Sequence, residues 1–504
     1  MTLSVKPARR RTTSALCAGV ATLLAMQAAA MQADMQAAWA QSDGESATDC
    51  IERSPRPAYG GTFYDNDFSY LEDPCLPADD SRDALARQTD RAKRIDLGAG
   101  VLASFGGESR LKYHDENNHA KSRLDGRDNS FLLNRLRLYG DLEIGQHLRV
   151  FGEMVDARSF GEEFSPRGTE EVHWDLLNGF GEIRGAVQDV DLQLRGGRQE
   201  LLFGAQRLIS PLDWGNTRRS FDGGRAGLTV GQLDVSAWFV FPRTIEPDAT
   251  SDRDEDTTFA GAYATYRFQP DLLLDLYALH LDREDENAGE RETWTVGARH
   301  AGREGQVFWE LEGAYQFGDQ KSPGTGPELD VSAGMFTVGV GYDFAELLPW
   351  KPRLSLYYDV ATGDDDPNDD EVNTFDQLFP LAHAYFGFID LVGRRNIEAV
   401  SLRLSLQPHR RLRLSLAGHH FALKSEEDAL YNAGGAAIRS DPTGRSGSEV
   451  GQELDVTATV SLLDRVGLQF GYSHFWGGEF VDNTGAAGVS GDASFFYTQL
   501  TARF

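Results

Sequence analysis

Apolar and polar residues alternate along most of the chain from about residue 92 onward. The clearest example is residues 401–416, where Leu402, Leu404 and Leu406 alternate with Arg403 and Ser405 before a short break, after which the same alternation repeats. A period of two is typical of a β-strand with one apolar and one polar face. A helix of the same residues would carry arginines on every side. The pattern therefore predicts paired strands.

Extended over the whole chain, the alternation predicts eighteen strands. They lie at residues 92–105, 129–143, 147–158, 172–187, 189–198, 224–230, 233–242, 257–269, 271–282, 291–301, 306–317, 331–345, 353–361, 395–407, 410–423, 449–462, 465–476 and 492–504. Short connections follow the even-numbered strands and long connections follow the odd-numbered ones, including 106–128 and 283–290. Transmembrane barrels are built from such alternating short turns and long outer loops. The predicted fold is all-β, a transmembrane antiparallel up-and-down β-barrel of about eighteen strands.

Composition agrees with a barrel that lies in a bacterial outer membrane. Only 40% of the residues are hydrophobic, and no internal apolar stretch reaches the roughly 20 residues of a transmembrane helix. In the last strand Phe496, Leu500 and Phe504 share one face, and the chain ends on Phe504. Such a strand resembles the signal that outer-membrane assembly machinery reads. We therefore expect contact with outer-membrane lipid and lipopolysaccharide.

The N-terminal part divides into two segments. Residues 1–40 have a basic start, an apolar run and small residues before position 41, which predicts a signal peptide; a soluble helix is the alternative. Residues 41–91 contain four prolines and little periodicity, which indicates a periplasmic segment before the barrel at 92–504. In an oxidising periplasm Cys50 and Cys75 are expected to form a disulfide, with two free thiols as the alternative.

The net charge of −29 argues against nucleic acid as a partner, because phosphates would be repelled. The acidic residues gather in the predicted outer loops, where Asp364, Asp366 and Asp370 are weak candidates for a structural Ca²⁺ site. Solvation of surface loops is the alternative explanation. No other metal and no cofactor are expected.

Enzyme motifs are sparse. The chain lacks a Gly-x-Ser-x-Gly elbow, a His-Glu-x-x-His motif and a phosphate-binding loop. His419 and His420 lie near Ser415, but the sequence places no acidic partner beside them, and neighbouring strand residues face opposite ways. The protein is therefore not expected to be an enzyme.

If the leucine faces meet lipid, the opposite faces line the lumen. Several arginines fall on these polar faces or in the loop 199–223, and they are the predicted pore-lining residues. They are Arg135, Arg137, Arg195, Arg207, Arg218, Arg219, Arg225, Arg353, Arg403 and Arg413. Rings of arginine make a pore favour anions. The alternative is that each arginine pairs with a luminal carboxylate such as Glu153 and only fills space.

Three stretches resemble the alginate-export family of outer-membrane proteins. They are residues 197–223 (GRQELLFGAQRLISPLDWGNTRRSFDG), 373–396 (NTFDQLFPLAHAYFGFIDLVGRRN) and 451–455 (GQELD). The resemblance extends loosely over 92–504. It implies an eighteen-stranded monomeric barrel with an arginine-rich constriction that passes the polyuronate alginate, and it adds Arg198 to the candidate constriction residues.

One departure from the family is evident. The resemblance implies a long periplasmic loop before the last two strands that plugs the pore, whereas here the connection at 463–465 is a tight turn. Gating by that element is not expected. Loop 199–223 is the candidate for folding into the lumen, because Phe203, Trp214 and Phe221 give it apolar packing groups.

The leading hypothesis is a channel for acidic saccharides, including alginate-like polyuronate, through an arginine-lined lumen. A general uptake porin is the alternative within transport. Hypotheses from other classes are an outer-membrane hydrolase, which requires a nucleophile and base within hydrogen-bond reach, and an adhesin, which requires a plugged lumen and exposed binding loops.

Overall fold

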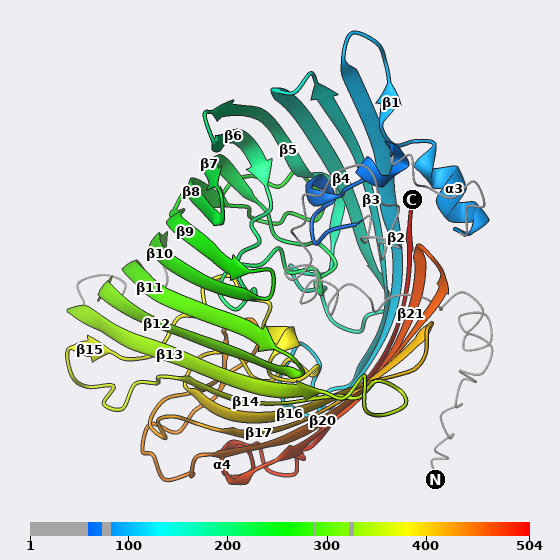
Figure 1. Ribbon diagram of the computed structural model, residues 1–504. Coiled ribbons are helices and arrows are strands. Elements are labelled where there is room, and N and C mark those ends of the chain that lie inside the picture. Colours follow the sequence, from blue (N-terminus) through cyan, green and yellow to red (C-terminus); the bar gives the residue numbers. More distant parts are fainter. Residues whose placement is uncertain (1–58, 73–81, 286–288, 322–326) are drawn as a thin grey trace, which may run out of the picture.

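Eighteen long antiparallel strands close into a barrel in the computed structural model (Figure 1). The structure describes residues 59–72, 82–285, 289–321 and 327–504. The wall strands are β2 (Val101–Asn117), β3 (Asn129–Ile144), β4 (Leu148–Phe160), β5 (Val172–Val187), β6 (Val190–Gln199), β7 (Phe221–Val230), β8 (Leu233–Pro242), β9 (Thr257–Gln269), β10 (Leu272–Asp285), β11 (Gly289–Glu304), β12 (Val307–Lys321), β13 (Glu328–Asp343), β14 (Arg353–Ala361), β16 (Ile397–His409), β17 (Leu412–Ala422), β20 (Glu449–Leu463), β21 (Val466–Gly477) and β22 (Ala493–Arg503).

Pairing of the first and last wall strands closes the barrel. Strands β2 and β22 run antiparallel from the Glu108–Arg503 pair to the Asn117–Ser494 pair. Beyond the last strand, the backbone of Phe504 exchanges two hydrogen bonds with Gly107, of 2.8 and 2.9 Å. Closure leaves no open sheet edge, as a membrane-spanning sheet requires.

The remaining elements are short and lie at the two ends of the barrel or inside it. Before the barrel come η1 (Phe63–Asp65), η2 (Ser69–Glu72), α3 (Ala84–Asp90) and β1 (Ile95–Asp96). The outer loops contain β15 (Glu371–Val372), η3 (Ala382–Ala384), β18 (Leu430–Tyr431), β19 (Ala437–Arg439) and α4 (Glu479–Thr484). Among the described residues, no helix is long and apolar enough to cross a membrane.

The alternation of apolar and polar residues explains the wall. Side chains such as Leu138, Ile183, Val340 and Leu402 are exposed on the outside, whereas the intervening polar side chains face inward and are mostly buried. Because an apolar band faces lipid and a polar surface lines the interior, the barrel has the arrangement of a membrane channel.

Two sequence predictions of strand position were wrong. The first wall strand is β2 at Val101–Asn117, not 92–105, so residues 106–117 belong to the wall and not to an outer loop. The connection predicted at 283–290 is only three residues long, since β10 ends at Asp285 and β11 begins at Gly289. In both places charged residues continue the strand, and the sequence pattern indicated a loop there.

Two outer loops fold back into the lumen and form its core. Residues 200–220, between β6 and β7, meet residues 373–396, between β14 and β16, in a short parallel contact at Ile209 and Phe379. The Phe379 backbone accepts a hydrogen bond from Ser210 N and donates one to Leu208 O, both 2.9 Å. In Figure 1 these loops cross the space enclosed by the strands. The prediction that 199–223 folds inward is therefore confirmed.

An aromatic stack fastens these two loops together. The Trp214 ring lies 3.6 Å from the His383 ring at an interplanar angle of 14°, and His383 stacks in turn on Phe388 at 4.4 Å. Lys112 of β2 places its ammonium 3.6 Å from the Trp214 ring centroid on the wall side. Both faces of Trp214 are therefore occupied by protein.

Glycines on the inner face make room for large rings. Gly339 of β13 lies directly under the Tyr357 ring of β14, where an added Cβ would collide with that ring. Tyr357 is buried, and the Arg403 guanidinium lies 4.9 Å from the centroid of its ring. We expect Gly339→Ala to lower the free energy of unfolding by about 1–3 kcal/mol through overpacking, measured by urea unfolding in lipid vesicles.

The control for this variant is Gly152→Ala on β4. No atom lies within 4 Å of the Cβ that this substitution adds, so its effect should stay within about 0.5 kcal/mol. Equal effects of the two variants would show that the contact with Tyr357 does not constrain the wall.

Candidate functional site

Most of the predicted pore-lining arginines are held in ion pairs on the inner wall or within the loops. Arg137 of β3 lies 2.6 Å from Glu153 of β4, and Arg195 of β6 lies 2.6 Å from Glu182 of β5. The further pairs are Arg135 with Glu108 and Asp213, Arg198 with Asp222, Arg207 with Glu310 and Glu312, and Arg218 with Glu200 and Asp213. These six arginines therefore pair with luminal carboxylates, which is the alternative that the sequence analysis left open.

Asp213 is the centre of the densest of these clusters. Its carboxylate lies 2.8 Å from Arg135, 3.1 Å from Arg110 and in direct contact with Arg218. Burial alone would raise the pKa of Asp213, but Arg110, Arg218 and Arg135 together lower it well below its usual range. The charge of this one residue thus holds loop 200–220 against β2 and β3.

The other five predicted arginines have no carboxylate partner recorded within the described part of the chain. They are Arg219, Arg225, Arg353, Arg403 and Arg413. Arg219 donates to the Ser210 carbonyl at 3.2 Å and Arg225 to the Ser236 hydroxyl at 3.0 Å. These two lie on the side of the lumen where loop 200–220 packs.

Arg353, Arg403 and Arg413 lie together on three neighbouring strands, β14, β16 and β17. In the strand register Arg353 faces Ser405, and Arg403 faces Ser355. Ser405 in turn faces Ser415, next to Arg413 on its inner face. All three arginines and the three serines are half-buried, so this part of the lumen stays accessible. We call these six residues the arginine–serine patch.

The sequence analysis missed other charged residues of the lumen. Glu108, Arg110 and Lys112 of β2 all point inward, and all three are buried. Their alternation with Ser109 and Leu111 was a strand signal, but Gly106 and Gly107 before it and the charges within it indicated a loop. The acidic partners Glu200 and Asp213 come from a loop, for which no periodicity exists.

A hydroxyl, an imidazole and a carboxylate meet on the wall beneath loop 373–396. The Ser401 hydroxyl lies 2.7 Å from His419 Nδ1, and His419 Nε2 lies 3.2 Å from Asp455. Nucleophilic catalysis requires that a substrate carbonyl reach the hydroxyl. Ser401 is 0% exposed. The Phe388 amide donates a hydrogen bond to Asp455, and the Ile389 amide donates one to Glu453. The cluster therefore serves as a support for the loop in this structure.

The predicted calcium ligands lie in an outer loop. Asp364, Asp366 and Asp370 lie in the outer loop after β14, and within the described ranges no group of three or more His, Cys, Asp or Glu side chains is arranged to hold a metal ion. The calcium site stays a prediction. The signal peptide, Cys50 and Cys75 lie outside the described residues.

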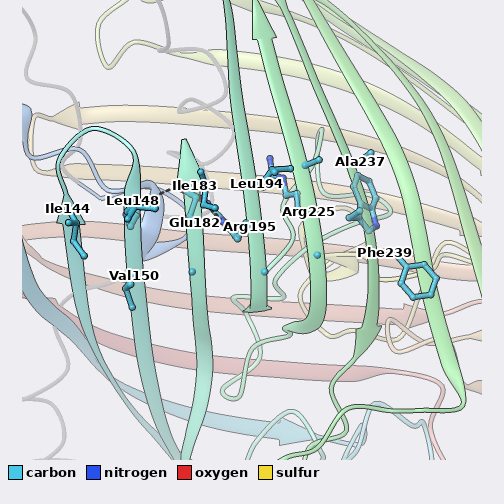
Figure 2. A pocket seen from close by; sticks show the side chains of 16 residues that line it. Ile144, Leu148, Val150, Glu182, Ile183, Leu194, Arg195, Arg225, Ala237 and Phe239 are labelled. Carbon is cyan, nitrogen blue, oxygen red and sulfur yellow. Dashed lines mark hydrogen bonds and ion pairs between the residues drawn. The ribbon is translucent and has the colours of Figure 1, made fainter. Parts of the chain in front are cut away.

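A hollow of about 820 Å³ opens on the wall at β3 to β8. Figure 2 shows Val150, Ile183, Leu194 and Phe239 around it, and all four are exposed on the outer face of the barrel. Its floor contains Gly181, Gly196 and Gly224, which pair with one another across β5, β6 and β7. Because it faces lipid, this hollow is not the permeation path.

Comparison with known proteins gives the family. The alginate export profile matches residues 101–492. The chain belongs to the alginate export family. No curated protein matches the sequence.

Solved structures confirm the fold of this alginate export family member. The chain is similar to OccD3 (OpdP) of Pseudomonas aeruginosa, with a TM-score of 0.54, 13% identity and coverage of 82% of this chain and 95% of that one. For OccAB2 of Acinetobacter baumannii the values are 0.54, 10%, 81% and 99%. For OccK8 (OprE) of P. aeruginosa they are 0.52, 14%, 80% and 98%. At such low identity the likeness shows the fold alone.

Family and fold together place the protein in the bacterial outer membrane as a porin-like channel. The sequence prediction of an eighteen-stranded antiparallel barrel in this membrane is confirmed. The side chains that line the lumen determine what can cross it.

Proposed function

We propose that this channel passes anionic saccharides, including alginate-like polyuronate, by passive diffusion that the arginine–serine patch favours electrostatically. The observation that carries the proposal is that Arg353, Arg403 and Arg413 have no carboxylate partner recorded among the described residues, although the rest of the lumen is rich in ion pairs. Family membership is in accord with this substrate class.

Aromatic rings and a loop carbonyl hold two of these arginines without neutralising them. Arg353 lies 3.9 Å from the Phe308 ring centroid, and Arg403 donates a 2.9 Å hydrogen bond to the Tyr385 carbonyl. A cation over a ring keeps its full charge. A passing carboxylate therefore meets positive charges that are fixed in place.

The magnitude is sufficient to influence permeation. Two unit charges 4 Å apart interact by about 4 kcal/mol at an effective dielectric constant of 20, which offsets part of the cost of removing a carboxylate from bulk water. The hydroxyls of Ser355 and Ser405 lie between the arginines and can donate to and accept from sugar hydroxyls. A polymer with one carboxylate on each sugar would meet this patch repeatedly.

The test is single-channel current in planar bilayers under a salt gradient, with and without polyuronate. We expect a reversal potential that favours anions and a current that polyuronate blocks. The double variant Arg403→Glu with Arg413→Glu should shift the reversal potential toward cations and weaken the block, because it replaces two positive luminal charges by negative ones.

The matched control is Arg253→Glu with Arg445→Glu. Both residues are exposed in outer loops, so the same charge change should leave the reversal potential near that of the parent. A cation-selective parent channel that ignores polyuronate would overturn the proposal and favour a general uptake porin.

The proposal includes the physical setting of the channel. We propose a monomer surrounded by outer-membrane lipid and lipopolysaccharide, delivered by assembly machinery that reads the last strand and Phe504. The pairing of Phe504 with Gly107 at the seam between β22 and β2 supports a part for this residue in closing the barrel. Covalent chemistry has no part in the proposed passage.

A further inference from the structure

Part of the segment before the barrel packs inside it. The sequence predicted a periplasmic segment at 41–91, and among its described residues Phe63, Tyr64 and Phe68 are buried. Phe63 and Tyr64 pack on Tyr139, Phe151 and Phe180, three aromatic side chains that point inward from β3, β4 and β5. Residues 59–72 therefore occupy the lumen next to these strands, and in Figure 1 the blue turn lies inside the ring of strands.

This segment covers positive charge on the wall. The Arg137 guanidinium lies 3.9 Å from the Phe63 ring centroid, and the Arg195 guanidinium lies 4.4 Å from that of Tyr64. Arg149 donates a 2.8 Å hydrogen bond to the Tyr64 carbonyl, and Arg218 donates one of 2.9 Å to the Gly61 carbonyl. Four luminal arginines are thus in contact with the segment and not with the aqueous lumen.

The segment is folded on itself and is not woven into the wall. Its recorded backbone-to-backbone hydrogen bonds run from Asp65 to Thr62, from Asn66 to Phe63 and from Leu71 to Phe68, all internal. The Thr62 hydroxyl donates to Asp65 and the Gly60 amide to Asn66, which closes a compact turn. Release of the segment would therefore break no backbone hydrogen bond between wall strands.

A second contact anchors the following helix at the periplasmic rim. Arg465, in the turn between β20 and β21, binds Asp90 at the end of α3 and donates a 2.9 Å hydrogen bond to the Tyr70 hydroxyl. The Asp464 carboxylate accepts a 2.8 Å hydrogen bond from the Asp83 amide, and the Asp83 carboxylate accepts one of 2.6 Å from the Asp464 amide. These contacts tie Tyr70 and α3 to the rim at the turn between β20 and β21.

We infer that residues 59–72 form a removable periplasmic plug, and that its release widens the lumen and uncovers Arg137 and Arg195. The inference rests on the channel proposed above in one respect, that ions cross the lumen. It does not depend on which ions the channel prefers. The tight turn between β20 and β21, which contains Asp464 and Arg465, serves here as the rim anchor of the plug.

The first test is the single-channel conductance in potassium chloride of the full chain with Phe63→Ala and Tyr64→Ala. Loss of both rings removes the packing on Tyr139, Phe151 and Phe180, so we expect a severalfold rise in conductance. The control is Tyr266→Ala with Phe268→Ala, a matching pair of aromatic residues near the periplasmic end of β9 that contact each other on the outer face. An unchanged conductance in the first variant would overturn the inference.

Two further measurements keep the test decisive. Arg465→Gln removes the guanidinium that binds Asp90 and Tyr70 and lies over the Tyr59 ring, and it should also raise the conductance. Heat-modifiable gel mobility checks that each variant folds. Thr62→Cys, made with Cys50→Ser and Cys75→Ser, places a thiol at a fully buried position of the plug. A charged thiol reagent should label it slowly in the native channel, and labelling only after denaturation would show that the plug does not leave.

The reversal potential separates this inference from the proposed function. Raised conductance in a cation-selective channel would overturn the proposed anion preference and leave the plug standing. Anion selectivity with unaltered conductance and no native labelling would overturn the plug and leave the proposed function standing.

Discussion

Asp213→Asn is expected to loosen loop 200–220 and to increase the anion preference of the channel. The substitution keeps the shape of the side chain but removes the charge that Arg110, Arg135 and Arg218 share. Arg135 retains Glu108 and Arg218 retains Glu200, whereas Arg110 loses the only carboxylate recorded for it among the described residues. Removing one partner of a buried pair costs about 3–5 kcal/mol, since it leaves an uncompensated charge.

The pH dependence of this effect has a definite sign. The folded pKa of Asp213 lies well below its usual range because the three arginines outweigh the effect of burial. A lowered folded pKa contributes stability above the ordinary value of about 4, and that stability is lost as pH falls through the folded value. The difference in unfolding free energy between parent and variant should therefore be constant from neutral pH down to about pH 5.

The measurement is urea unfolding in lipid vesicles together with the reversal potential. Asp125→Asn is the control, because Asp125 pairs with Arg127 in an exposed outer loop, and exposed pairs contribute about 0–1 kcal/mol. If Asp213→Asn is no more destabilising than this control, the arginines around Asp213 are solvated by water and the loop is held by packing alone.

The wall of this barrel could be predicted from sequence because membrane and lumen impose a period of two. The bounds predicted for 172–187, 233–242, 257–269 and 353–361 coincide with β5, β8, β9 and β14. In these strands local alternation carries the information. A one-residue shift would turn every apolar side chain inward, so the register is strongly specified.

The same reasoning failed where inner residues are charged for a distant reason. In β2 the inward residues Glu108, Arg110 and Lys112 contact Arg135, Asp213 and Trp214. Charged inner residues obscure the alternation of apolar and polar positions that identifies a strand. The partners of these residues in loop 200–220 cannot be found from local periodicity. For the same reason, the sequence predicted which arginines face the lumen but not which of them form ion pairs and which belong to the arginine–serine patch.

Position 207 shows how a loop residue can hold both inward-folded loops. Arg207 binds Glu310 of β12 through two hydrogen bonds of 2.9 Å and Glu312 through one of 2.8 Å. It also lies 4.7 Å from the ring centroid of Tyr385 in loop 373–396. Burial alone would lower the pKa of Arg207, but Glu310, Tyr385 and Glu312 raise it well above its ordinary value. This guanidinium stays charged at every working pH.

Arg207→Met should destabilise the loops and open the lumen. Glu310 keeps Arg299 at 2.7 Å, but Glu312 is left with the Tyr277 hydroxyl at 3.1 Å and no recorded cation within the described residues. The expected loss is about 3–5 kcal/mol, with a higher conductance because Leu208 and Ser210, which follow directly, form the contact with Phe379. Arg207→Lys should recover only part of the stability, since a lysine cannot bind Glu310 through two parallel bonds.

A double-mutant cycle decides whether the charge pair or the loop packing is responsible. Glu312→Gln in the Arg207→Met background removes the carboxylate that the single variant leaves without a cation. If the uncompensated charge causes the loss, the double variant should be more stable than Arg207→Met alone, with a coupling of about 0.5–3 kcal/mol. If instead the free-energy losses of the two single variants add, Arg207 acts through its packing on Tyr385. The ion pairs would then contribute less to the shape of the lumen than their number implies.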